Sequence, residues 1–167
     1  MAGFSLIIHK ADFKAMLKRF YAKAGDMTPA MKSFGEYMLR RTDERFSKEQ
    51  DPQGKPWRRL AAATILAGHR GRVYTRRGRV SKGFMRYAEG LKVLTVSHRL
   101  RRSITYKAGR TSLAVGTNVV YGRIHQLGGQ AGKGHTVTIP ARPFLGFSPV
   151  DVSQAVAEVR RFLGFTA

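Results

Sequence analysis

The chain has no cysteine among its 167 residues. This absence excludes disulfides and thiolate metal sites, and it fits a reducing cytosol. Long apolar runs are missing too. The run between Phe4 and Ile8 is too short for a signal peptide or a membrane span, and no basic region precedes it. We therefore expect a soluble protein with no membrane partner.

Residues that commonly bind metals or carry catalysis are scattered. The five histidines have no metal-ligand spacing between them: His9, His69, His98, His125 and His135. Seven of the ten acids lie before Gly54, so no carboxylate cluster for a metal nuclease is expected near the basic middle of the chain. A Gly-x-Ser-x-Gly elbow for serine catalysis is absent.

The run from Gly129 to His135 resembles a phosphate-binding loop only superficially. Leu127 stands where a Walker motif needs Gly, and Gly134 stands where it needs Ser or Thr. A flexible glycine loop is the better interpretation. Together these absences predict a protein that is not an enzyme, with no metal site and no cofactor.

Acidic residues are nearly absent from the middle of the chain. Residues 55–110 contain sixteen Lys or Arg and a single acid, Glu89, whereas each flank has a surplus of only three bases. This segment therefore supplies most of the formal charge of +21. Concentrated like charge costs self-repulsion, which favours an acidic partner. The alternative is a solvated segment whose charge aids solubility.

Residues 68–90, called the basic arm below, are rich in Gly and Arg and show little periodicity. We predict an extended loop. Its candidates for contact with phosphates or an acidic partner are Arg70, Arg72, Arg76, Arg77, Arg79, Lys82 and Arg86. Tyr74, Phe84 and Tyr87 lie among them and could stack on nucleotides or pack on the domain. Base-specific contact is not predicted, since no DNA-reading motif is present.

Periodicity and capping signals predict an α+β fold with a mainly antiparallel sheet. Thr28-Pro29 and Ser148-Pro149 are helix start signals. We predict one domain over 1–167 with N-terminal helices, a C-terminal helix and the long basic arm. The predicted elements are a strand over 4–9, helices over 12–24 and 28–48, a turn over 51–56, a helical turn over 61–67, a short apolar strand over 91–96, a helical turn at 100–104, a hairpin over 103–116, a helical turn or strand end over 119–127, a loop over 128–134, a strand over 135–139 and a helix over 149–163.

Several motifs occur in a fixed order. Phe46 is followed by Pro-Gln-Gly-Lys-Pro-Trp-Arg-Arg-Leu over 52–60, and Leu-Arg-Arg-Ser-Ile stands at 100–104. Val-Gly-Thr-Asn then begins at Val115, Tyr-Gly-Arg-Ile-His-Gln-Leu-Gly at Tyr121 and Pro-Ala-Arg-Pro-Phe-Leu-Gly at Pro140. In this order they resemble the virion morphogenesis or tail completion proteins of Mu-like and P2-like tailed phages. The residues that match are Pro52, Gly54, Trp57, Gly116, Asn118, Tyr121, His125, Gln126, Gly128, Gly129, Arg142, Pro143 and Phe144.

The chain departs from the family pattern at three places. Gly122 replaces the usual Ala, Ser97-His98 stands where Thr-Gly is common, and the basic arm is longer and more basic than is typical. The resemblance implies a structural virion protein without catalysis, acting in tail completion or head–tail joining. It also implies a homo-oligomeric ring, often six-fold, in the tail or at the head–tail junction after a stage in the host cytoplasm.

The partners implied are connector, tail-terminator or tail-tube proteins, and a ring on the DNA exit path would also lie near packaged DNA. A protein that binds nucleic acid without sequence specificity is the alternative function.

Four of the motif residues leave alternatives open. Trp57 is predicted as a core residue rather than an interface anchor. His125 and Gln126 are predicted to fix the loop at Gly128 and Gly129 by hydrogen bonds rather than to act in catalysis. Arg142 either orders the same part of the chain or pairs with a neighbour's carboxylate.

Overall fold

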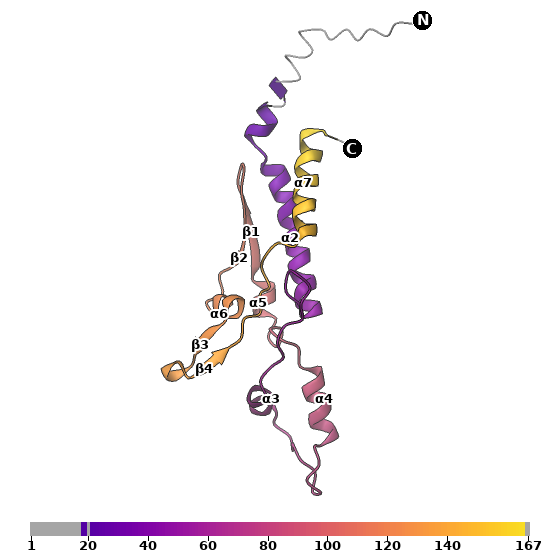
Figure 1. Cartoon of the computed structure of the whole chain (residues 1–167), viewed down its shortest axis with the longest axis vertical. Helices are drawn as coiled ribbons and strands as arrows, with labels where there is room; N and C mark the ends of the chain where they lie inside the picture. Colours follow the sequence, from indigo (N-terminus) through magenta and orange to yellow (C-terminus); the bar gives the residue numbers. More distant parts are fainter. Residues whose placement is uncertain (1–17, 20, 166–167) are drawn as a thin grey trace, which may run out of the picture. The chain divides into compact units, whose positions relative to one another are not determined.

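The computed structural model describes residues 18–19 and 21–165 (Figure 1). The strand predicted over 4–9 and the first half of the helix predicted over 12–24 lie outside these residues, while residues 21–25 are helical. The described elements are α2 (Thr28–Lys48), α3 (Ala62–Gly68), α4 (Lys82–Gly90), α5 (Arg99–Arg102), β1 (Ile104–Ala108), β2 (Leu113–Thr117), α6 (Gly122–Leu127), β3 (Gly129–Ala131), η1 (Lys133–His135), β4 (Val137–Ile139) and α7 (Pro149–Leu163). Helices combined with two small two-stranded antiparallel sheets confirm the α+β class.

The chain divides into two compact units. The first, here the helical unit, comprises the described residues up to 38 together with residues 106–115 and 149–165. The second, here the central unit, comprises residues 39–105 and 116–148. The bounds of α2 and α7 confirm the two helices predicted from the Thr-Pro and Ser-Pro start signals. Asp26 accepts a hydrogen bond from the Thr28 amide at 3.0 Å, just before α2 begins.

In the helical unit, α7 lies against the first part of α2 through polar side chains. The Tyr37 hydroxyl donates to Asp151 Oδ1 at 3.0 Å, and the Ser33 hydroxyl donates to Glu158 Oε2 at 3.0 Å. Asp151 and Glu158 are buried, although charged residues seldom are. Val152 and Val156 of α7 are exposed, whereas Ala155, Val159 and Phe162 are partly buried. The predicted apolar repeat of this helix is therefore divided between an exposed part and a partly buried part.

The predicted hairpin over 103–116 is present as β1 and β2. The Gly109 amide donates to the Ser112 carbonyl at 2.8 Å and closes the turn. Within the helical unit the Tyr106 ring lies directly on Gly35 of α2. A Cβ atom added to Gly35 would stand 2.4 Å from Tyr106 Cδ2, well inside van der Waals contact. Only glycine leaves room for this ring at that point of the helix.

The core of the central unit is built largely from the family-motif residues. Its buried members are Phe46, Trp57, Val93, Leu100, Val119 and Phe144. The Phe46 ring contacts the Trp57 ring edge-on at 5.5 Å between centroids and the Phe144 ring at 5.4 Å. Because aromatic side chains bury the largest apolar areas, these three rings dominate the stability of the unit.

The basic arm is more ordered than its composition suggested. Residues 82–90 form α4 instead of continuing the predicted loop, and an isolated antiparallel bridge joins Tyr74 and Val80. Ser81 is the N-cap of α4, and its hydroxyl accepts from the Phe84 amide at 3.1 Å. The same hydroxyl donates to the Arg72 carbonyl at 2.7 Å. One side chain thus joins the base of a turn to the start of a helix.

Two further predictions of local structure are wrong. Residues 91–96 do not form a strand, because Leu94 has a φ of 62° and the Val93 amide donates to the Glu49 carboxylate. The predicted loop over 128–134 contains β3, which pairs Gly129 with Ile139 and Ala131 with Val137. Gly128 begins this hairpin with a φ of 75°, where an added Cβ would lie 2.8 Å from the Ala141 amide nitrogen.

Candidate functional site

Three hydrogen bonds of the central unit are made by the Gln126 side chain, at the end of α6. Its Oε1 accepts from the amides of Phe144 and Leu145, both at 3.0 Å. Its Nε2 donates to the Leu145 carbonyl at 2.8 Å. Gln126 was predicted to fix the loop at Gly128, and this is corrected: the side chain holds residues 144–145. The position of Phe144 in the core therefore depends on an amide side chain.

Arg142 orders the neighbouring segment of the chain. Its guanidinium donates to the carbonyls of Arg58 at 2.8 Å and Arg59 at 3.1 Å, and its amide donates to the His125 carbonyl at 2.7 Å. The side chain is buried, and this burial lowers the pKa of Arg142. Of the two roles left open for Arg142, the hydrogen bonds within the subunit are those of an ordering residue.

Trp57 also contacts this segment. Residues 57–59, Gln126 and residues 142–145, which these hydrogen bonds join, are called the corner below. It is buried, and its Nε1 donates to the Pro143 carbonyl at 2.8 Å. This placement agrees with the core role that the sequence favoured. Trp57 and Arg142 together form three hydrogen bonds between residues 57–59 and residues 142–143. Segments more than eighty residues apart in sequence are thereby fixed together.

The other motif residues support this corner in different ways. Pro52 is buried against Gly146, whose added Cβ would lie 2.8 Å from Pro52 Cγ. Gly54 has a φ of 86° in the predicted turn. Tyr121 meets His125 edge-on at 5.8 Å. Gly116 lies within β2, and Asn118 is exposed directly after that strand.

One buried residue of the corner was missed by the sequence analysis. Arg45 on α2 donates from Nη1 to the Gly146 carbonyl at 2.8 Å and to the Phe144 carbonyl at 3.3 Å. Its only signal in the sequence is its place beside Phe46, since an arginine on a helix is normally expected to be solvated.

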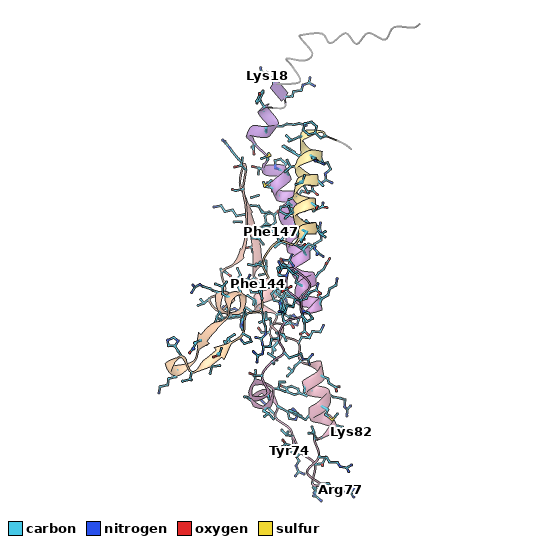
Figure 2. All side chains as sticks on the ribbon, in the orientation of Figure 1. Lys18, Tyr74, Arg77, Lys82, Phe144 and Phe147 are labelled. Carbon is cyan, nitrogen blue, oxygen red and sulfur yellow. The ribbon has the colours of Figure 1, made fainter. Side chains whose placement is uncertain are left out.

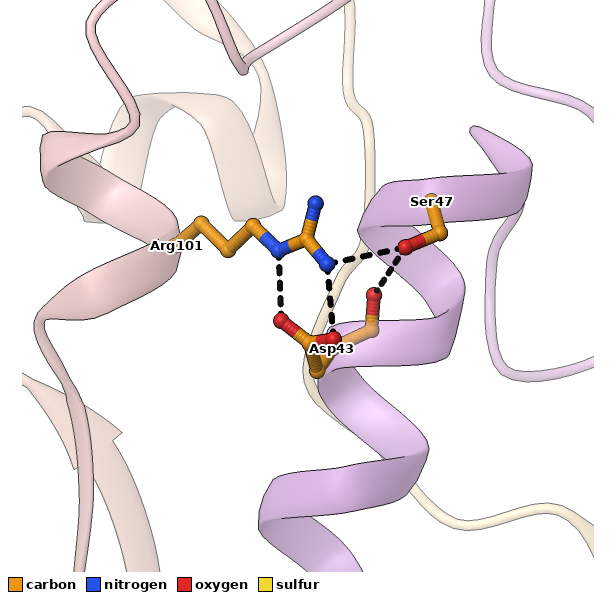
Figure 3. Close-up of polar contacts among 3 residues, drawn as sticks. All are labelled: Asp43, Ser47 and Arg101. Carbon is orange, nitrogen blue, oxygen red and sulfur yellow. Dashed lines mark hydrogen bonds and ion pairs between the residues drawn. The ribbon is translucent and has the colours of Figure 1, made fainter.

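An ion pair on the central unit neutralises one of the sixteen basic residues between 55 and 110 (Figure 3). Arg101 donates to both carboxylate oxygens of Asp43, with Nη2 at 2.6 Å from Oδ2, and to Ser47 Oγ at 2.9 Å. The hydrogen bonds from Arg101 lower the pKa of Asp43, and the same contacts raise the pKa of Arg101. Arg101 therefore stabilises α5 against α2 within the unit.

The seven cations predicted to contact phosphates or an acidic partner all lie on the basic arm. Within the described residues none of these side chains forms a hydrogen bond or an ion pair. Three of them, Arg76, Arg77 and Arg79, belong to a closed turn. Its bonds are from the Thr75 amide to the Arg79 carbonyl at 2.7 Å and from the Gly78 amide to the Thr75 carbonyl at 3.0 Å. Figure 2 labels Arg77 at the free end of this segment.

The aromatic residues of the basic arm divide between two roles. Phe84 and Tyr87 pack on His69, at 5.1 and 4.8 Å between ring centroids, and so join α4 to the end of α3. Tyr74 is 61% exposed beside the turn. Of the three aromatic residues, Tyr74 is the one left accessible for stacking on a partner (Figure 2).

Two kinds of site find no support in the part of the chain that the structure describes. Across residues 18–19 and 21–165, His, Asp and Glu side chains nowhere gather in the groups of three that could hold a metal ion. The described helices also include none that is both long enough and apolar enough to cross a membrane.

Comparison with known proteins confirms the family that the order of the motifs indicated. The sequence pattern of the phage virion morphogenesis family matches residues 8–164. A relative described as the Mu-like prophage FluMu G protein 2 of Haemophilus influenzae is 41% identical over 69 residues. This alignment covers 41% of the chain and 50% of the relative, so the chain spans about half the length of the curated relative that it matches. No solved structure matches the chain.

Proposed function

Because the chain belongs to the phage virion morphogenesis family, we propose that it acts in tail completion or head–tail joining during virion assembly. The observation that carries this proposal is the match over residues 8–164, which includes every residue of the hydrogen-bonded corner around Gln126, Trp57 and Arg142. The proposed role is structural and has no catalytic step. The protein would act at the head–tail junction or the upper end of the tail, after a stage in the host cytoplasm.

A knockout of this reading frame in the phage that encodes it tests the proposal. Negative-stain imaging of the lysate is expected to reveal separate heads and tails, or tails with an unfinished upper end. A plasmid copy of the wild-type chain should restore joined particles. Normally joined, infectious virions without the protein would end the proposal.

The proposed ring is a homo-oligomer, and the exposed side of α7 supports contact between copies. Val152 and Val156 are 54% and 46% exposed, one helical turn apart on the same face. α7 itself carries two acids and two bases, so two copies can approach here with little of the repulsion that the basic segment would cause. We therefore assign the α7 valines to the contact with a second copy.

Mass photometry of the purified protein tests this contact. Wild-type protein is expected to form a discrete oligomer, and V152D/V156D is expected to remain monomeric because two carboxylates would have to be buried. V96D is the matched control, since Val96 is equally apolar and 77% exposed but lies on the central unit. Equal assembly of V152D/V156D and wild type would remove α7 from the contact.

The basic arm favours a second candidate function, binding of nucleic acid without sequence specificity. Its turn presents three arginines next to an exposed tyrosine, and phosphate contact requires only such cations. Titration of DNA binding against salt tests it. A steep loss of affinity between low and physiological salt supports this function, and no binding at low salt removes it.

A further inference from the structure

The central unit contains a groove that the proposed function does not use. It has a volume of about 630 Å³ and is lined by residues 58–61, Thr64, strand β4, His125, Pro140 and Arg142. Its apolar lining includes Leu60, Val137 and Ile139. Its charged lining is entirely cationic, from Arg58, Arg59 and Arg142, because the described residues that form it include no Asp or Glu.

The cations of the groove are only partly compensated. Arg142 donates hydrogen bonds from Nε to the Arg58 carbonyl and from Nη2 to the Arg59 carbonyl. The guanidinium groups of Arg58 and Arg59 themselves form no hydrogen bond or ion pair with any described residue. Burial lowers the pKa of Arg142, and the charge of Arg58 lowers it further. An anion in the groove would relieve this repulsion, and a carboxylate fits a guanidinium through two parallel hydrogen bonds.

The groove follows the edge of a strand. Val137, Thr138 and Ile139, which make up β4, all line it, whereas no residue of β3 does. Successive side chains of a strand point to opposite faces, so a groove that touches three consecutive residues runs along the edge. β4 belongs to a two-stranded sheet and pairs with β3 alone among the described strands. Its second edge can therefore accept a further strand.

These features select a peptide rather than a nucleic acid or a second copy. A phosphate backbone would satisfy the arginines but would leave the strand edge and the apolar lining unused. A second copy is a poor source of carboxylates: the chain has ten acids, of which Asp151 and Glu158 are buried and Asp43 is paired with Arg101. The remaining candidate is an acidic segment of a different protein, in extended conformation.

We propose that this groove binds an extended acidic peptide segment of a partner protein, which adds to the free edge of β4. Alternate side chains of the segment would place carboxylates on Arg58 and Arg59 and apolar groups against Leu60 and Ile139. The inference goes beyond the proposed role in virion assembly and does not depend on the stage at which the protein acts.

The test uses a fluorescein-labelled peptide, Ser-Glu-Val-Glu-Val-Glu-Ser, and the full-length protein. Binding is followed by fluorescence anisotropy, and amide hydrogen exchange is measured at residues 137–139. We expect binding, protection of the β4 amides, and affinity that falls at least a hundredfold in R58E/R59E, which is about 2.8 kcal/mol, because two attractive charge contacts are replaced by repulsive ones. Arg58 and Arg59 are exposed, so their replacement leaves the fold intact, and this is checked by thermal unfolding.

R76E/R77E is the matched control, because it makes the same change of charge on the basic arm. Its affinity for the peptide is expected to equal that of the wild type. Equal weakening by both variants would mean general attraction to a cationic protein, and binding without protection of β4 would exclude strand addition. Either result overturns the proposal. A third result would also overturn it: duplex DNA displaces the peptide completely, and this displacement depends on Arg58 and Arg59. The groove would then be a phosphate-binding site.

Discussion

Gln126 and Leu145 exchange two hydrogen bonds, one in each direction. The Leu145 amide donates to Gln126 Oε1 at 3.0 Å, and Gln126 Nε2 donates to the Leu145 carbonyl at 2.8 Å. A side-chain amide thus pairs with the backbone as a neighbouring strand would. This pairing holds Phe144 in the core, because Phe144 also donates its amide to the same oxygen.

Gln126→Ala is expected to destabilise the protein by about 2–4 kcal/mol, since three backbone groups lose their partner in a part-buried site. Gln126→Glu should cost less, because its carboxylate still accepts from both amides and only the bond to the Leu145 carbonyl is lost. Urea unfolding of the two variants measures the difference. A change below about 0.5 kcal/mol in the alanine variant would mean that the corner is held without this residue.

Gly35→Ala is expected to destabilise the protein, although alanine is the better helix former by about 1 kcal/mol. The reason is the Tyr106 ring, three of whose carbons would lie 2.4–2.7 Å from the new Cβ. Gly83→Ala on α4 is the matched control, because nothing lies within 4 Å of its added Cβ, and it should be neutral or stabilising. Thermal unfolding of Gly35→Ala, Tyr106→Ala and the double variant completes a double-mutant cycle and measures the coupling. Zero coupling would contradict the close contact.

Replacing Arg76, Arg77 and Arg79 by Gln is expected to weaken DNA binding and reduce its dependence on salt. Each phosphate contact that is lost lowers the slope of log affinity against log salt by about 0.9 for duplex DNA. The control replaces Lys32, Lys48 and Arg123, which are exposed cations outside the basic arm. If both triple variants lose the same slope, the protein binds through its net charge and the arm has no special part.

Stability is expected to fall as the pH drops below 6.5 because of His125. Burial, and then the charge of Arg142, lowers the pKa of His125 below its ordinary 6.5. Between the two pKa values the unfolded chain binds more protons than the folded chain, so the free energy of unfolding rises with pH across this window and is lost on acidification. Denaturant unfolding at stepped pH measures the slope.

His125→Gln provides the control for this dependence on pH, since it removes the titrating imidazole. The slope just below pH 6.5 should disappear in this variant. Asp43, whose pKa is lowered by Arg101, acts with the same sign but only around and below its ordinary value of 3.8, so a slope that begins just below pH 6.5 does not come from Asp43. An unchanged slope in His125→Gln would assign the effect to another group.

Much of the fold could be predicted from the sequence where the signals are local. Thr28-Pro29 and Pro149 mark helix starts, and the turn beside Gly109 marks a hairpin, because in each case neighbouring residues determine the backbone. The α4 helix was missed since its start signal, Ser81, stands in a segment whose Gly and Arg content is typical of loops. β3 was missed because strand pairing with residues 137–139, and not its own composition, makes it a strand.

The candidate site divides in the same way. The identities of Trp57, Gln126 and Arg142 could be recognised from motifs, but their partners could not, because those partners are backbone groups far away in sequence. The burial of Asp151 and Glu158, with Val152 and Val156 exposed, was not predictable either. The spacing of Val152 and Val156 indicates that they share a helix face with other apolar residues. Which face is turned inward depends on hydrogen bonds that the spacing does not reveal, from the Tyr37 hydroxyl to Asp151 and from the Ser33 hydroxyl to Glu158.

The Ser81 hydroxyl, which bonds both to the Arg72 carbonyl and to the Phe84 amide, has a consequence for how the arginine turn meets whatever it touches. A loop that becomes ordered only on binding loses conformational entropy at that moment, and this loss weakens the affinity. In this turn the entropy is already lost when the chain folds. The turn is therefore preorganised for its target, and removal of the Ser81 hydroxyl would make each binding event include the entropy loss again.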